Sequence, residues 1–372
     1  MLQGLLVLIA WYQFYNHFNP QLMNLLHLCI ALTIDLGLNR PQSLGQWQLR
    51  VVIDTTSLLH GKGVSQGLRT TDEHRALLGV YFLCAKLSYA FKRLDPMRYT
   101  QHLEDCCQFL LTEAEYPSDI TLVQHVRLQH ILEKYMPDAM GLSALSVPVR
   151  SFVKCFEEDI KNFKQSVPRD LLPSAHLEIH ILSAQIGLYE FVQTADLDPL
   201  IHRIEAWYAC LNCISQYWDL FLAEPSENLP TLTFISWLHT IQPLLMLAKL
   251  SFLITDGWDL DFVRTKWAFG AFIDRLAEKL ESVTRTDVSH THRTVGARFN
   301  MYAEKMRMCK RWYESKIRAE NAVKASEAAA TLPERPVPNP PSPDIPFQDL
   351  FDGLEDGMWQ DFMYDWAIPT QF

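Results

Sequence analysis

The first 332 residues are poor in the residue types that interrupt helices. They contain 12 glycines and 12 prolines, about 7% together, whereas average proteins hold about 12%. Signals for strands are also lacking, because no apolar and polar residues alternate and no Asn-Gly or Asp-Gly turn joins two such runs. We therefore predict an all-α fold, with one large domain of about ten to twelve helices.

Signals for export or for membrane insertion are absent as well. No run of 18 or more apolar residues occurs, so we expect no membrane span. The apolar N-terminus, 1–10, has neither a positively charged start nor a small-residue cleavage site. The eight cysteines are scattered, which is typical of proteins from a reducing compartment. We expect a soluble intracellular protein.

Basic residues do not outnumber acidic residues either. The chain has 33 basic and 43 acidic residues, a net charge of −10, which argues against unaided binding of duplex DNA. A hydrophobic content of 48% excludes disorder of the whole chain. Most of the negative net charge lies at the C-terminal end of the chain. Residues 344–372 hold seven acidic and no basic residues, whereas residues 1–343 hold 36 acidic and 33 basic residues.

Apolar residues recur at helical spacing in several segments. One stripe comprises Val149, Phe152, Val153, Phe156, Ile160 and Phe163. A second comprises Phe262, Phe269, Phe272, Ile273, Leu276 and Leu280. Charged residues fall outside both stripes, so we predict amphipathic helices here.

Capping residues and helix breakers predict where helices start and stop. Gly37 and Pro41 are expected to end a helix, and residues 71–73 to begin one that runs to about Arg93. Residues 95–96 are expected to start a short helix, and residues 117–119 a helix that runs to about Tyr135.

The composition changes abruptly after residue 332. Residues 333–346 hold seven prolines in fourteen positions and predict a stiff, proline-rich linker. Residues 347–372 combine acidic and aromatic residues, with apolar anchors at helical spacing. We predict a disordered tail that folds on a partner, the alternative being a tail that only confers solubility. Its predicted partner-binding residues are Phe347, Phe351, Trp359, Phe362 and Trp366.

Four patterns resemble chemical motifs, but we interpret each as structural. Gly63-Val-Ser-Gln-Gly67 lacks the strand–helix setting of a nucleophile elbow. His176 and His180 lie four residues apart, but the metalloprotease glutamate is misplaced and no third ligand is suggested. Cys210 and Cys213 lie in an aromatic mid-helix stretch, and residues 157–159 point in different directions. We therefore predict no catalytic, cofactor-binding or metal-binding residue.

The most basic stretch contains Lys305, Arg307, Lys310 and Arg311. It is a candidate nuclear-import signal or contact for an acidic partner. The alternative is the solvated face of an amphipathic helix, because apolar residues occur here at helical spacing. They are Phe299, Tyr302, Met306, Tyr313 and Ile317.

Several short sequence segments in the first 135 residues resemble the middle homology region of fungal zinc-cluster transcription factors, and they occur in the same order as in that family. They include Asp35-Leu-Gly-Leu-Asn-Arg-Pro41 and Arg93-Leu-Asp-Pro-Met-Arg98, and further matches lie in 2–12, 24–34, 73–83, 99–103, 117–119 and 122–129. The resemblance implies a helical regulatory domain of a nuclear transcription regulator. Asp35 and Arg40 are expected to flank a helix end. Five further charged residues of these segments are expected to form buried or bridging polar pairs that support the fold, namely Glu73, Arg75, Arg93, Asp95 and Arg98.

The chain departs from the family pattern in two respects. The six closely spaced cysteines of the zinc cluster do not occur, and Met1 falls inside the homology region. The usual paired arginine is His74-Arg75 here. We expect either a truncated gene model or a regulator without its DNA-binding end, so that DNA is a partner only if a zinc cluster precedes Met1.

The sequence thus predicts a nuclear transcription regulator made of three parts. They are a helical regulatory domain in 1–332, a linker in 333–346 and an activation-like tail in 347–372. We expect homodimer or coregulator contacts through the helical domain, and contacts with the transcription machinery through the tail. The alternatives are an interaction scaffold without a transcriptional role and, third, an all-α enzyme.

Overall fold

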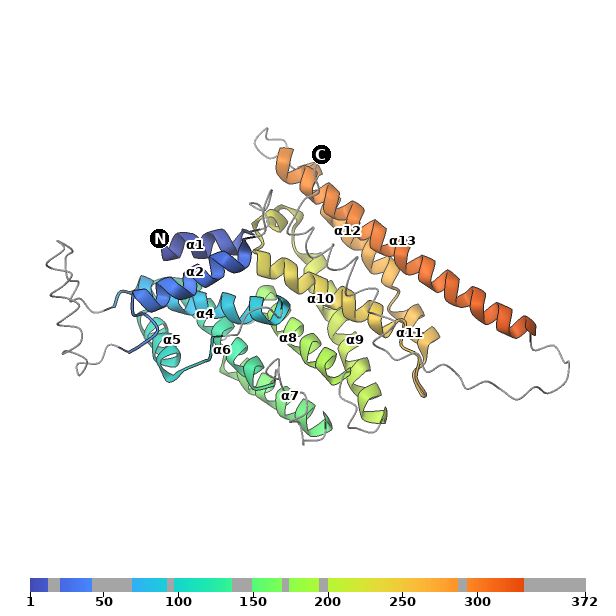
Figure 1. Ribbon diagram of the computed structural model, residues 1–372, viewed down its shortest axis with the longest axis horizontal. Coiled ribbons are helices and arrows are strands. Elements are labelled where there is room, and N and C mark those ends of the chain that lie inside the picture. Colours follow the sequence, from blue (N-terminus) through green and yellow to red (C-terminus); the bar gives the residue numbers. More distant parts are fainter. Residues whose placement is uncertain are drawn as a thin grey trace. The chain divides into compact units, whose positions relative to one another are not determined.

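Helices make up the regular secondary structure of the computed structural model. It describes residues 1–12, 21–41, 69–91, 97–135, 149–168, 174–193, 200–286 and 293–330. These residues form twelve α-helices and one 3-10 helix, and none of them lies in a strand (Figure 1). The all-α class and the number of helices expected from the sequence are confirmed.

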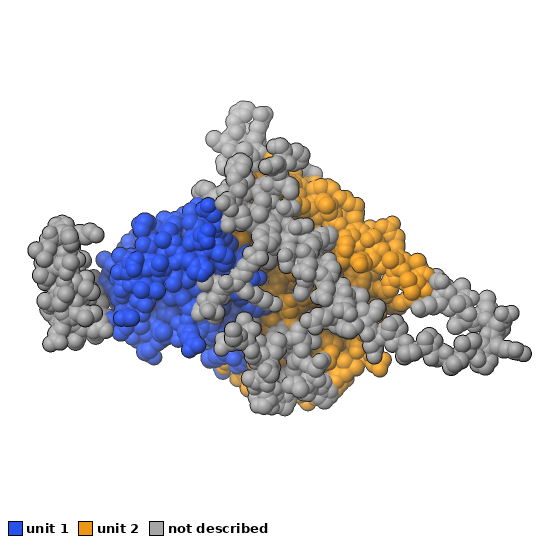
Figure 2. Space-filling view, viewed as in Figure 1, with its two compact units in different colours: residues 1–12, 20–139, 160–172 blue, residues 13–19, 140–159, 173–372 orange. Residues whose placement is uncertain are grey.

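The chain divides into two compact units (Figure 2). Unit 1 comprises residues 1–12, 20–139 and 160–172, and unit 2 comprises residues 13–19, 140–159 and 173–372. The helix α7, Val149–Ser166, contributes its first part to unit 2 and its last part to unit 1. Phe156, Ile160 and Phe163 of the predicted stripe are buried, and the lysines and glutamates of α7 are mostly exposed.

Unit 1 is built around α4, Thr71–Phe91. The helices α1, α2, α5 and α6 pack against it, with bounds Leu2–Ala10, Leu22–Asp35, Gln101–Glu113 and Pro117–Tyr135. From Leu83 to Ser88 every side chain of α4 is buried, as expected for a helix that is covered on all sides.

Three helix ends in unit 1 follow the predicted signals, one of them with a shift of one residue. Gly37, at φ +66°, ends α2, and its N–H donates to the carbonyl of Ile34. Thr70 rather than Thr71 caps α4, because its hydroxyl accepts from the N–H of Glu73 while the Glu73 carboxylate accepts from the N–H of Thr70. Pro117 is the first residue of α6, as expected.

The expected helix start at residues 95–96 is wrong. Residues 97–100 are not helical, and α5 begins at Gln101. The side chain of Thr100 accepts a hydrogen bond from the N–H of Leu103, so the helix starts where this acceptor is available.

Unit 2 contains α8, α9, η4, α10, α11, α12 and α13. Their bounds are Ala175–Gln193, Leu200–Ala223, Ser226–Thr231, Phe234–Leu250, Leu260–Lys266, Phe269–Thr286 and Arg293–Ala330. The indoles of Trp207, Trp218 and Trp237 are fully buried in its core. Figure 1 shows α12 alongside the first part of the long α13, and these two helices pack extensively.

The second predicted stripe spans two helices and not one. Phe262 belongs to α11, and the remaining members belong to α12. Trp267 is the C-cap of α11, its ring is buried, and its indole N–H donates to the hydroxyl of Ser215. Phe262 is 46% exposed, whereas Phe269 and Ile273 are buried.

The predicted linker 333–346, the predicted tail 347–372 and the motif Gly63–Gly67 lie outside the described residues. The domain boundaries drawn from composition therefore stay predictions.

Candidate functional site

The predicted basic stretch lies on α13, on the part of this helix that packs against α12. Arg307 contacts Glu281 of α12 at 2.6 Å, and Lys310 contacts Asp274 of α12 at 2.5 Å. Arg311 contacts Glu304 at 2.9 Å within α13. The carboxylate of Asp274 raises the pKa of Lys310 above its ordinary value, because its hydrogen bond favours the charged amine.

Arg307, Lys310 and Arg311 of the predicted import stretch thus form ion pairs that support the packing of α13. Phe299, Tyr302, Met306 and Tyr313 are buried beneath them, which confirms the amphipathic helix. An acidic partner or an import receptor would have to compete with the α12 carboxylates for Arg307 and Lys310. The import role of Lys305, Arg307, Lys310 and Arg311 stays a prediction. The five predicted tail residues lie outside the described part of the chain.

Arg75 organises the polar contacts of unit 1. Its guanidinium donates to Asp119 at 2.7 Å, to Asp72 at 2.7 Å and to Glu115 at 2.6 Å. It also lies over the ring of Tyr116, 4.6 Å from the centroid. Because these groups come from the starts of α4 and α6 and from the turn before α6, one side chain ties three segments together.

The sequence identified Arg75 as a polar-pair residue but not its partners. Asp119 is 1% exposed, and its second oxygen accepts from the N–H of Tyr116. The hydrogen bond from Arg75 holds the pKa of Asp119 below its ordinary value. The other charged residues of the family-like segments have different settings. Glu73 caps α4, Arg98 is exposed, and Arg93 and Asp95 lie outside the described residues.

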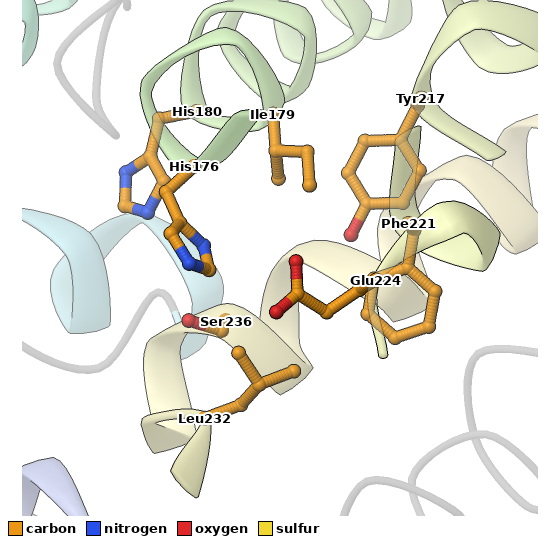
Figure 3. Close-up of a pocket in the computed structure, with 8 residues that line it drawn as sticks. All are labelled: His176, Ile179, His180, Tyr217, Phe221, Glu224, Leu232 and Ser236. Atoms are coloured by element: carbon orange, nitrogen blue, oxygen red, sulfur yellow. The ribbon is translucent and has the colours of Figure 1, made fainter. Parts of the chain in front are cut away.

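A hollow in unit 2 brings together side chains from three helices (Figure 3). It holds about 330 Å³ of empty space, its open mouth included. The lining residues are His176, Ile179 and His180 of α8, Tyr217 and Phe221 of α9, Glu224, Leu232 and Ser236. Figure 3 shows the carboxylate of Glu224 pointing into the hollow, towards the His176 ring.

The predicted histidine pair is therefore part of the hollow, on one face of α8. His180 is buried and its ring meets the ring of His239 edge-on, with 4.4 Å between centroids. His176 lies at the mouth and is exposed. Among the described residues, no group of three His, Cys, Asp or Glu side chains is arranged to hold a metal ion.

A polar seam continues from this hollow along the packed faces of α8 and α10. The hydroxyl of Ser183 donates to Gln242 at 3.2 Å, and the amide of Gln242 donates to Glu190 at 3.4 Å. Lys249 closes the seam with an ion pair to Glu190 at 3.0 Å. Sequence reasoning missed these partners, because each pair joins residues more than 50 positions apart.

Cys210 and Cys213 lie inside α9 and are buried, as the sequence indicated. Burial raises the pKa of the Cys210 thiol well above its ordinary value, so little of the nucleophilic thiolate forms at neutral pH. No described helix is long and apolar enough to cross a membrane.

The second half of the chain matches a known family. Residues 226–372 match the family model described as ATEG07667_C, C-terminal domain. The match begins at η4, so it includes the three helices α10, α12 and α13 that enclose much of the unit 2 core.

Curated relatives cover more of the chain. It is 23% identical to transcription factor opdL of Penicillium oxalicum over 365 residues, which is 94% of this chain and 62% of the relative. It is 34% identical to transcription factor himD of Aspergillus japonicus over 135 residues, 36% of this chain and 21% of the relative. It is 27% identical to transcription factor pbcR of Emericella nidulans, over 41% of this chain and 21% of the relative.

The chain thus spans less than two thirds of the length of these relatives. No solved structure matches it. The relatives are named as fungal transcription factors, and they support the resemblance of the first 135 residues to the regulatory region of fungal zinc-cluster transcription factors.

Proposed function

We propose that this chain is the regulatory and activating part of a fungal transcription regulator that works in the nucleus. The similarity to transcription factor opdL over 94% of the chain carries the proposal. The match to a family C-terminal domain over residues 226–372 supports it, because this range includes both α13 and the acidic tail.

In this proposal the helical units bind proteins and not a substrate. Their charged clusters join helix ends, as Arg75 does at the starts of α4 and α6. The units would contact a coregulator or a second copy of the chain, and no reaction and no bound cofactor are assigned to them.

The tail would contact the transcription machinery. Its acidic residues keep Phe347, Phe351, Trp359, Phe362 and Trp366 in water until a partner binds, and their spacing suits one face of a helix. In the sequence the long helix α13 precedes the proline-rich segment.

A transferable activation assay tests the tail. Residues 344–372 are fused to an unrelated DNA-binding domain and the expression of a reporter gene is measured. We expect activation that is lost when Phe351, Trp359, Phe362 and Trp366 are all replaced by alanine, because the apolar anchors supply the binding free energy.

The matched control replaces Gln360, Thr370 and Gln371 by alanine and should keep full activation. A silent fusion, or one that is indifferent to the loss of the four aromatics, would refute the role of the tail.

Imaging of the full chain with a fluorescent label tests the location. We expect nuclear signal, and its loss when Lys305, Arg307, Lys310 and Arg311 are replaced by glutamine. Replacing Arg275 and Lys279 of α12 by glutamine is the control for a loss of charge near the same helices. Cytoplasmic signal of the unaltered chain would favour a scaffold role.

A further inference from the structure

Five large apolar side chains are exposed on the described part of unit 2, and three of them lie on or next to α9 and α11. They are Ile201 at 58%, Ile254 at 77% and Phe262 at 46% exposed. Ile201 belongs to α9, Phe262 to α11, and Ile254 to the segment that leads through Gly257 into α11. Single exposed apolar residues are common, so these three are significant only if they belong to one surface.

A ring contact and a close backbone approach connect the three positions. The ring of Tyr208 on α9 lies 6.5 Å from the ring of Phe262 on α11. Gly257, at φ +76°, lies so near α9 that an added Cβ would be 3.2 Å from the Cδ1 atom of Ile204. Ile201 lies one turn before Ile204 on α9. The exposed residues therefore belong to one surface made by α9, α11 and the segment before α11.

The rim of this surface is acidic. Glu205 of α9 and the three aspartates Asp256, Asp259 and Asp261 are all exposed. In the described ranges no Lys or Arg forms an ion pair with any of the four, and Glu205 lies 3.7 Å from the ring nitrogen of His202. The α9–α11 surface is defined as these four carboxylates together with Ile201, Ile204, Tyr208, Ile254 and Phe262.

The basic side chains of α11 are already engaged. The ammonium group of Lys266 lies over the rings of Phe262 and Trp267, 5.5 and 4.4 Å from their centroids. The guanidinium of Arg264 pairs with Glu320 of α13 at 2.6 Å. The rim of the α9–α11 surface therefore keeps an excess of negative charge.

This charge limits what can cover the surface. A second copy of the chain docked through the same surface would place two acidic rims against each other, and like charges across an interface disfavour binding. The predicted tail of the chain is repelled in the same way, because residues 344–372 hold seven acidic and no basic residues. Nucleic acids and anionic membranes are disfavoured as well. A protein that presents basic residues next to apolar ones is complementary to the surface.

We propose that the α9–α11 surface is the docking site for a basic amphipathic helix of another protein. The apolar stripe of that helix covers Ile201, Ile254 and Phe262, and its Lys or Arg side chains face the acidic rim. An amphipathic helix suits the surface because it carries apolar and charged residues side by side on one short element. The proposal rests on the proposed function in one respect, that the helical units bind proteins, and it adds the surface and the chemistry of the partner.

Binding of a designed peptide to the full chain tests the chemistry of the partner. The probe is a fluorescent helical peptide of about 18 residues, with leucines along one face and lysines beside them. Its twin carries glutamates in place of the lysines. We expect the lysine peptide to bind about ten-fold more tightly than its twin, measured by fluorescence anisotropy in about 0.15 M salt. Equal binding of the two peptides, or no binding of the lysine peptide at about 1 mM, would overturn the proposal.

Two pairs of substitutions test the site. Ile254→Ser combined with Phe262→Ala should weaken binding of the lysine peptide by about ten-fold, because the apolar contacts are lost. Asp256→Asn combined with Asp261→Asn should weaken it by about three-fold or more, because the rim loses half of its carboxylates. Asp259 stays unaltered, since its carboxylate accepts from the N–H of Phe262 and caps α11.

The matched control removes two carboxylates elsewhere in unit 2. Glu227→Gln combined with Glu278→Gln alters exposed residues of η4 and α12 and should leave binding unchanged. The tail variant with four alanines is a second control, because an acidic tail also attracts basic peptides. Circular dichroism and the melting temperature should be the same for all variants.

Two results would refute the docking site. Binding that persists in both pairs of surface substitutions, or that is lost in the tail variant alone, would place the peptide elsewhere on the chain. Neither result bears on the reporter assay of the tail, so a failure of the docking site is distinguishable from a failure of the proposed role in transcription.

Discussion

The two units differ in their most deeply buried contacts, although ion pairs occur in both. In unit 1 a single arginine joins three carboxylates at the ends of helices, and further hydrogen bonds link Tyr81 to Glu133 and Tyr99 to Glu104. In unit 2 the rings of α9, α10 and α13 form a continuous chain in the core, from Tyr217 and Phe221 through Trp237 to Phe299.

The difference shows two ways of fixing helices in an all-α protein. Ion pairs select which helix ends meet, because charge sign and hydrogen-bond geometry must both match. Burial of large rings contributes more free energy per residue but is less directional. We therefore expect unit 2 to be sensitive to the loss of volume and unit 1 to the loss of charge.

The largest effect is expected from Trp218→Ala in unit 2. The indole is fully buried and lies against the rings of Tyr217, Phe221 and Phe272. Its removal should lower the free energy of unfolding by about 3–5 kcal/mol. Urea unfolding followed by circular dichroism measures the loss.

Phe262→Ala is the matched truncation of a ring that is 46% exposed. It should cost about 1 kcal/mol or less, since little buried area is lost. Equal losses in the two variants would show that ring burial does not dominate unit 2.

The next largest effect is expected from Arg75→Ala in unit 1. It leaves Asp119, which is 1% exposed, without its cation and should lower the free energy of unfolding by about 3 kcal/mol. Asp72→Ala removes the partner that is 64% exposed and should cost less than about 1 kcal/mol. The same unfolding experiment compares the two variants. A larger loss of unfolding free energy in Asp72→Ala would contradict the importance of the buried Arg75–Asp119 pair.

Among the three main variants, the smallest effect is a gain in stability from Lys86→Met. Lys86 is buried in α4, and no described carboxylate pairs with its ammonium group. Burial lowers its pKa from 10.5 to about 8, so the folded state disfavours the charged amine. Replacement by methionine should raise the free energy of unfolding at pH 7 by about 2 kcal/mol.

The pH dependence of this gain sharpens the test. Below about pH 8 the amine is charged in both the folded and the unfolded chain, so the full cost of burying it is present. Between about pH 8 and 10.5 the unfolded chain binds more protons, and the stability contributed by Lys86 rises with pH. The advantage of Lys86→Met over the unaltered chain should therefore shrink from pH 7 to pH 10, and a constant advantage would contradict a buried charge.

Local signals in the sequence were sufficient for much of the fold. The stripe through Phe156, Ile160 and Phe163 predicts α7 because burial of one helix face leaves a period of 3.6 residues. Gly37 and Pro117 mark helix ends because their backbone preferences act within one turn. The start of α5 was missed, because the cap at Thr100 was not distinguished from the stronger signal at Pro96.

The candidate sites were less accessible to sequence reasoning. His176 and His180 were noticed for their spacing, but Glu224, Ser236 and Tyr217 carry no local signal that relates them to α8. Likewise, Arg75 was noticed but Glu115 and Asp119 are 40 and 44 residues away along the chain.

The sequence by itself determined the helical class, most helix ends and the location of the negative charge in residues 344–372, because propensity, capping and composition act over a few residues. Only the tertiary structure decided that the chain forms two units, that α12 carboxylates pair with the basic stretch of α13, and that Glu224 faces the histidines of α8. These contacts depend on which helix faces pack together, and helix packing is set by the shape of many side chains at once.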